Sequence, residues 1–226
     1  MSLAQKIKSI NNRKAALVLE DGTIFLGNGF GATKKLTGEV VFSTSMVGYP
    51  ESLTDPSYKG QILSLTYPLI GNYGVPSQDL DYNLPLYFES DHIQTSGLII
   101  QELCKTPHHW ASKRTLDQWL LDEGIPGISG IDTRRLTKKL RNHGVMLGII
   151  QVFDENEEPT IDELVKESQF ISDPNQNNIV KEISVKEPLC YNTGGKQTVV
   201  LIDCGVKNSI LRNLLRRKIN VIRVPY

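Results

Sequence analysis

Length, composition and charge set the first limits. The chain has 226 residues, of which 39% are hydrophobic and 22% charged, the profile of a globular protein of one or two domains. Basic and acidic residues number 25 each, so the basic excess of a protein that binds nucleic-acid phosphates is missing. No apolar run approaches the roughly 20 residues that cross a bilayer, and residues 1–13 show no secretory signal. We therefore expect neither a nucleic-acid nor a membrane partner.

The first apolar segments predict a β-hairpin. Residues 15–19 and 24–26 flank Asp21-Gly22, a dipeptide typical of tight hairpin turns. Three glycines follow at alternate positions, Gly27, Gly29 and Gly31. Their spacing does not fit the dinucleotide-binding pattern, so we predict structural turns there.

Further strands and loops follow from composition. β-Branched and aromatic residues favour strands at 40–42, 61–66, 97–100 and 147–152. Proline, glycine and polar residues favour loops at 68–91, 124–130 and 173–178.

Three segments have the apolar spacing of helices: 115–121, 133–142 and 161–167. Thr115 or Ser112 would cap the first helix, and Asp132 or Thr133 the second, which would stop at Gly144.

The last residues predict a β-α-β unit. Residues 188–197 form the best domain boundary, and 198–202 are continuously apolar, like a strand buried on both faces. Residues 208–217 predict an amphipathic helix with Arg212 on its polar side, and 219–224 predict a second, parallel strand. One such unit cannot bury its own faces. We therefore expect the chain to be part of a longer protein.

Three cysteines, Cys104, Cys190 and Cys204, stand in unrelated contexts. Their odd number favours a reducing compartment over a disulfide framework, so we predict a cytoplasmic protein. Cys204 lies at the carboxyl end of a predicted strand, where α/β sheets place their sites. It has no histidine nearby in sequence, so a packing role is the simpler interpretation.

Three ordered segments, 38–72, 130–141 and 199–212, resemble the small subunit of glutamine-dependent carbamoyl phosphate synthetase. The resemblance covers residues 15–225. It implies an α/β protein with a layered β/β/α N-terminal domain over residues 1–195. Residues 197–226 would begin an open, mostly parallel, flavodoxin-like class I glutamine amidotransferase domain. The stretch Leu80–Tyr87 would be an insertion.

The resemblance also implies a function. In that family the small subunit takes ammonia from glutamine and passes it to a large subunit. The large subunit joins ammonia to bicarbonate and to phosphate from ATP, for pyrimidine and arginine production. The partner would thus be the large subunit, which would use ATP and Mg²⁺, and this chain would need no cofactor. The alternative is a scaffold for the large subunit with no hydrolytic task.

The family's residues match this chain at one functional position. None of the three cysteines stands in the Gly-x-Cys-x-Gly elbow of the family's nucleophile, so we assign no catalytic residue and expect the 226 residues alone to be inactive. In Leu53-Thr54-Asp55-Pro56-Ser57-Tyr58, the resemblance assigns Ser57 to glutamine binding. Asp55 and Pro56 suit a type I turn that presents Ser57, its hydroxyl and N–H both towards a ligand. From spacing alone, Ser57 would instead be a turn-stabilising serine.

Two further clusters invite functional interpretations. The basic residues of one predicted helix are Arg134, Arg135, Lys138, Lys139 and Arg141. They form either an anion site or a solvated helix face. His108 and His109 are adjacent and would point apart, and no Cys/His ligand spacing occurs, so we assign no metal.

Overall fold

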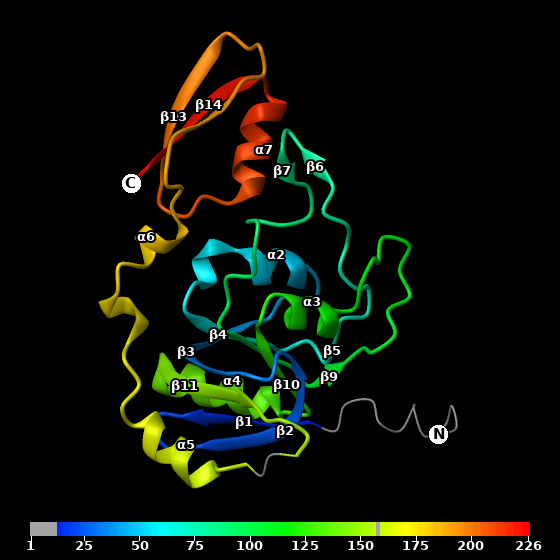
Figure 1. Ribbon diagram of the computed structural model, residues 1–226, viewed down its shortest axis with the longest axis vertical. Helices are drawn as coiled ribbons and strands as arrows, with labels where there is room; N and C mark the ends of the chain where they lie inside the picture. The colour runs from blue at the N-terminus through cyan, green and yellow to red at the C-terminus, as the bar shows by residue number, and fades with distance from the viewer. Residues whose placement is uncertain (1–12, 157–158) are drawn as a thin grey trace.

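A computed structural model describes residues 13–156 and 159–226. Its larger part is a barrel in which seven strands close in the order β1-β11-β3-β4-β8-β10-β2 (Figure 1). The strands are β1 (Lys14–Leu19), β2 (Ile24–Gly31), β3 (Lys35–Ser43), β4 (Gln61–Leu65), β8 (Gly97–Ile99), β10 (Pro126–Ser129) and β11 (Met146–Val152). The predicted hairpin is confirmed as the antiparallel pair β1 and β2. The mixed α/β class is also confirmed, whereas closure of the sheet was not expected.

Strands β3, β4, β8 and β10 run parallel to one another, so their carboxyl ends meet at one rim of the barrel. Side chains alternate between two cores along these strands. Ile62 and Ile99 belong to the core that also contains Leu17 and Ile150. Leu63 and Leu98 belong to a second core beside the helices that cover the barrel.

The glycines of β2 correct one prediction. Gly27 and Gly29 lie within the strand rather than in turns. A Cβ on Gly27 would lie 2.2 Å from the Ser129 carbonyl oxygen, and one on Gly29 would lie 2.6 Å from a Val152 methyl group. These glycines therefore permit close approach of neighbouring strands. Gly31, which has φ of 70°, ends the strand.

The helices were largely predictable. The structure has α2 (Tyr49–Thr54), α3 (Leu116–Asp122), α4 (Thr133–His143) and α5 (Ile161–Ser168). Thr115 caps α3 through the N–H of Gln118, at 3.2 Å. Asp132 caps α4, which ends at Gly144, as predicted. Across the described residues, none of the helices has the length and apolar character needed to cross a membrane.

Two stretches predicted as loops contain strands. Residues 124–130 include β10 of the barrel. Residues 68–91 include β5 (Leu69–Ile70), β6 (Leu80–Asp81) and β7 (Leu84–Pro85), and β5 pairs with β9 (Glu102–Leu103). The second stretch is no mere surface loop, because Val75, Leu84 and Phe88 are buried. Single apolar residues among polar ones show no helix or strand periodicity, so the sequence pattern did not predict that these side chains are buried.

A second, smaller sheet lies beyond the barrel, at the top of Figure 1. Its order is β12-β14-β13, formed by β12 (Leu189–Tyr191), β13 (Gln197–Asp203) and β14 (Ile219–Pro225), with α7 (Asn208–Arg216) between the last two. Strands β13 and β14 are parallel, so the predicted β-α-β unit is present. The stretch 188–197 contains β12, which pairs with β14. The sheet thus begins before Gln197, and the exact domain boundary stays a prediction.

Two expectations for this sheet were wrong. Strand β13 is not buried on both faces, since Val200 and Ile202 are 63% and 65% exposed. Arg212 does not lie on a solvated helix side, since it is only 7% exposed. The segment joining barrel and sheet runs along one side of the molecule and includes the short helices η2 (Pro174–Gln176) and α6 (Ile179–Ile183) (Figure 1). The first of these lies within the loop predicted at 173–178.

Candidate functional site

Ser57 lies in the middle of a single turn of 3₁₀-helix, η1 (Pro56–Tyr58). The N–H of Tyr58 donates to the carbonyl of Asp55 at 3.0 Å, which is the hydrogen bond of the predicted turn. The N–H of Ser57 donates to the Asp55 carboxylate at 2.9 Å. The prediction that this N–H faces a ligand is therefore wrong. The exposed Ser57 hydroxyl makes no hydrogen bond with the described residues. The turn therefore offers one polar group, the hydroxyl, on a fixed backbone.

The chain before the turn is tied to a neighbouring segment. The hydroxyl of Thr54 accepts the N–H of Glu89 at 2.9 Å and donates to the carbonyl of Pro50 at 2.8 Å. The Ser90 hydroxyl donates to the carbonyl of Thr54 at 2.6 Å. Because Thr54 and Glu89 are buried, these bonds hold η1 firmly to the body of the protein.

Asp55 connects the Ser57 turn to the second sheet. Its carboxylate, which is 9% exposed, forms an ion pair with the ammonium of Lys207. The pKa of Lys207 is raised above its usual value, chiefly by this hydrogen bond to Asp55. Pro56 also packs close to the loop after β13, since a Cβ on Gly205 would lie 3.3 Å from the Pro56 Cβ. The backbone of Gly205 also has φ of 93°. Glycine is therefore favoured there both by this positive φ and by the close approach of Pro56.

Glu89 provides a second connection to the same sheet. Its carboxylate accepts the N–H of Ser209 at 2.8 Å, and its carbonyl accepts the N–H of Asn208 at 2.9 Å. Both N–H groups belong to the first turn of α7, where they have no partner within the helix, and a negative charge is favourable at this end of a helix. No side chain within α7 caps this end, so a residue 120 positions earlier does so. Sequence reasoning missed Glu89, because capping from a distant segment leaves no local pattern.

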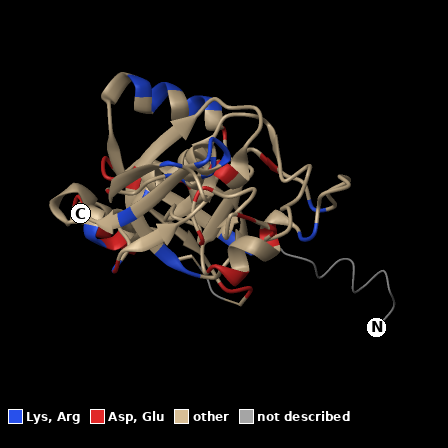
Figure 2. Ribbon diagram, turned by 90° about the horizontal axis from the view of Figure 1, so that it is seen from above, with Lys and Arg blue, Asp and Glu red and all other residues tan. Residues whose placement is uncertain are grey.

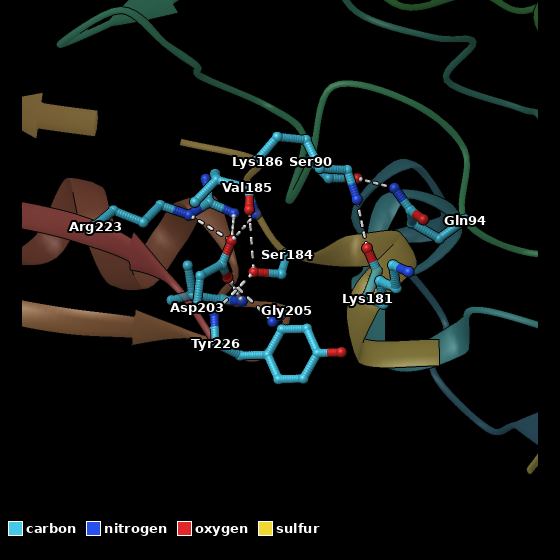
Figure 3. Close-up of polar contacts among 11 residues, drawn as sticks. Ser90, Gln94, Lys181, Ser184, Val185, Lys186, Asp203, Gly205, Arg223 and Tyr226 are labelled. Carbon is cyan, nitrogen blue, oxygen red and sulfur yellow. Dashed lines mark hydrogen bonds and ion pairs between the residues drawn. The ribbon is translucent and has the colours of Figure 1, made fainter. Parts of the chain in front are cut away.

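Asp203, at the end of β13, organises the loop beside the site (Figure 3). It is fully buried and accepts the Nε–H and Nη2–H of Arg223 at 2.9 and 2.7 Å. It also accepts the N–H of Val185 at 2.8 Å, and those of Gly205 and Val206 at 3.0 Å. Burial alone would raise the pKa of Asp203, but these hydrogen bonds and the Arg223 charge lower it below its usual value.

The stretch Leu80–Tyr87, predicted as an insertion, lies against α7. Leu84 is buried among Leu211 and Leu215 of α7 and Val221 of β14. Asp81 accepts two hydrogen bonds from the guanidinium of Arg216, at 2.7 and 3.0 Å. The same segment also covers Arg212, whose guanidinium donates to the carbonyls of Pro85 and Phe88. These contacts explain why Arg212 is buried. The β6–β7 hairpin thus fastens α7 to the barrel.

Barrel and second sheet leave a cavity of about 400 Å³ between them. Pro56, beside Ser57, contributes to its wall, together with Glu89, Asn208 and Arg223. The Ser57 turn and the loop after β13 therefore lie at the junction of the two parts. Ser57 itself is not among the described residues that line the cavity, so its hydroxyl lies beside the cavity and not in its wall.

The cysteines and the histidine pair singled out in the sequence are the remaining candidates. Cys190 and Cys204 are exposed, and Cys104 is half-buried, so the packing role predicted for Cys204 is wrong. His109 contacts the rings of Tyr73 and Trp110. Among the described residues, no group of three or more His, Cys, Asp or Glu side chains is placed to hold a metal ion.

Comparison with known proteins gives a consistent result. A family model described as the carbamoyl-phosphate synthase small chain, CPSase domain, matches residues 17–150. The carbamoyl phosphate synthase small chain of Archaeoglobus fulgidus is 49% identical over 213 residues, covering 94% of this chain and 56% of that protein. The small chain of Pyrococcus furiosus is 48% identical over 217 residues, covering 95% and 57%. The multifunctional protein CAD of Squalus acanthias is 48% identical over 215 residues, covering 94% and 9%. The chain spans little more than half the length of these two small chains.

Proposed function

Since the chain belongs to the carbamoyl-phosphate synthase small chain family, we propose that it acts in glutamine-dependent carbamoyl phosphate synthesis. Its full-length form would release ammonia from glutamine and deliver it to a large chain. The large chain would use bicarbonate, ATP and Mg²⁺. Residues 197–226 would then be the start of the flavodoxin-like glutaminase domain, and the protein would be cytoplasmic.

The observation that supports this proposal best is the Ser57 turn. Its hydroxyl is exposed, its backbone is fixed by Asp55, and Asp55 in turn binds Lys207 beside the second sheet. A glutamine held between the barrel and a glutaminase domain would meet this hydroxyl. The β-α-β unit lies where that domain would continue, and its exposed β13 offers an apolar surface on which further strands could pack.

The test is synthesis of carbamoyl phosphate by the full-length protein with its cognate large chain. With bicarbonate, ATP and Mg²⁺ supplied, glutamine should support the reaction. A complex that forms and uses ammonium but not glutamine would favour the scaffold alternative. Failure to form a complex, or to use either nitrogen donor, would contradict the proposal.

A further inference from the structure

The rim of the barrel holds a recess lined in part by cations that form no ion pair with the described residues. We call it the α4 recess, a cavity of about 510 Å³. One wall consists of Arg134, Lys138 and Arg141 of α4. The opposite wall includes Thr44, Thr66 and Gln101, which follow the carboxyl ends of the parallel strands β3, β4 and β8. No Asp or Glu is among the described residues that line it.

The basic residues of α4 fall into two groups. Lys139 forms an ion pair with Asp21 at 2.5 Å, and the guanidinium of Arg135 lies 5.6 Å from the ring centre of Phe25. These two residues fasten α4 to the β1–β2 hairpin.

The other group is Arg134, Lys138 and Arg141, spaced four and three residues apart, so it lies on one face of the helix. Within residues 13–156 and 159–226, none of these three forms an ion pair. Figure 2 shows one helix at the edge of the molecule with several Lys and Arg along it, and α4 has the most such residues of any helix described. Neither predicted alternative, an anion site or a solvated helix face, describes Lys139 and Arg135, which contact the hairpin. Only Arg134, Lys138 and Arg141 remain available to an anion.

Exposed apolar side chains adjoin the recess. Met46 and Val47, two and three residues after Thr44, are 68% and 72% exposed, and Tyr67, next to Thr66, is 38% exposed. Met, Tyr and Arg are enriched in protein–protein interfaces. The three cations extend over about 10 Å of helix, a span longer than a single phosphate and suited to an extended acidic segment.

We propose that the α4 recess is a docking surface for an acidic segment of a protein partner. Resting on the proposed function, that partner is the large chain, whose Asp or Glu side chains would pair with Arg134, Lys138 and Arg141. Exposed cations of this kind accelerate association and fix its register through charge complementarity.

The first test measures association of the full-length protein with its cognate large chain at low ionic strength. Lys138→Glu and Arg134→Glu should each slow association about tenfold, and added salt should reduce the difference. Lys34→Glu is the matched control, because exposed Lys34 precedes β3 and lies at the opposite end of that strand from Thr44. Unchanged rates, or the same loss in the control, would overturn the proposal.

The second test identifies the acidic residues. A carbodiimide joins lysine amines to carboxylates in direct contact. Mass spectrometry of the treated complex should find Lys138 joined to an Asp or Glu of the large chain. Lys138→Arg should abolish that product but keep the association rate. Cross-links from other lysines of this chain to the large chain, with none from Lys138, would contradict the proposal while leaving the proposed function intact. A wild-type protein that fails to bind the large chain would contradict both.

Discussion

At the scale of single residues, Asp55 has two tasks at the site. One carboxylate oxygen accepts the N–H of Ser57, and the other pairs with Lys207. The first contact fixes the turn, and the second connects it to the loop after β13. The family motif assigned Ser57 to glutamine binding, but it did not predict that the Asp55 carboxylate would accept the Ser57 N–H. A side chain that turns back on its own backbone is common for Asp before Pro.

Ser57→Ala should weaken glutamine use by the full-length complex. Losing a hydrogen bond to a charged substrate group costs roughly 1.5–3 kcal/mol, about 10- to 150-fold in kcat/KM for glutamine. Stability should change by less than about 0.5 kcal/mol, since Ser57 is exposed. Steady-state kinetics with glutamine and with ammonium separates the effects.

The ammonium-dependent reaction should be nearly unchanged in this variant. Ser77→Ala is a matched control, because the Ser77 hydroxyl donates a local hydrogen bond to Asp79, two residues later, at 2.6 Å. Equal losses with both nitrogen donors would make Ser57 a structural residue.

Asp203→Asn should destabilise the second sheet and reduce its acid sensitivity. The variant leaves Arg223 without its buried anion, a loss of roughly 3–5 kcal/mol. Because the folded-state pKa of Asp203 is lowered, its stabilisation is complete above the usual value of about 3.9 and is lost as pH falls through the folded value.

Thermal unfolding between about pH 3 and 7 checks this, since the gap between wild type and variant should shrink at the acid end. Asp91→Asn is the control, because Asp91 is exposed and surface substitutions usually change stability by less than about 0.5 kcal/mol. A gap independent of pH would contradict the assignment.

At the scale of elements, helix ends that depend on neighbouring residues could be predicted, whereas strands that form by pairing with distant segments could not. Thr115, Asp132 and Gly144 marked helix ends because capping depends on neighbouring residues. β10 was missed because Pro126-Gly127-Ile128-Ser129 reads as a turn in isolation. It becomes a strand through pairing with β2 and β8. Barrel closure likewise depends on contacts between segments far apart in sequence.

Leu84→Ala should loosen α7 from the barrel. Leu84 is 4% exposed and packs on Leu211 and Leu215, so the truncation should cost about 2–5 kcal/mol. Hydrogen exchange should show faster exchange of the α7 amides, with barrel strands less affected. Leu80→Ala in the same hairpin is the control, since Leu80 is 61% exposed and should cost less than about 0.5 kcal/mol. If both variants behave alike, the hairpin does not fasten α7.

At the scale of the whole molecule, the site depends on how the two parts are joined. The contacts of Asp55 with Lys207, Glu89 with Ser209 and Leu84 with Leu211 all cross that junction. The sequence could predict the first hairpin and the β-α-β unit from their own patterns. The family resemblance singled out Ser57, whose contact with glutamine stays a prediction. The partners across the junction could not be predicted, because charge and apolar character alone do not say which distant residues meet.

The 226 residues alone should not hydrolyse glutamine. None of the cysteines stands in a glycine-flanked elbow, and Ser57 offers only a hydroxyl. Ammonia release from glutamine by the purified protein should equal the rate without protein. Release that Cys204→Ser abolishes and Cys190→Ser leaves intact would contradict this expectation, since both thiols are exposed.

The two sheets differ in how they end, and this has a practical consequence. The barrel closes on itself, whereas β13 is an edge strand that, among the described residues, pairs with β14 alone. Its sequence, Gln-Thr-Val-Val-Leu-Ile-Asp, contains no Lys, Arg or Pro, the residues that usually discourage edge pairing. A concentrated solution of this chain should therefore self-associate by strand addition at β13, while the barrel stays folded. Val200→Lys should keep the protein monomeric.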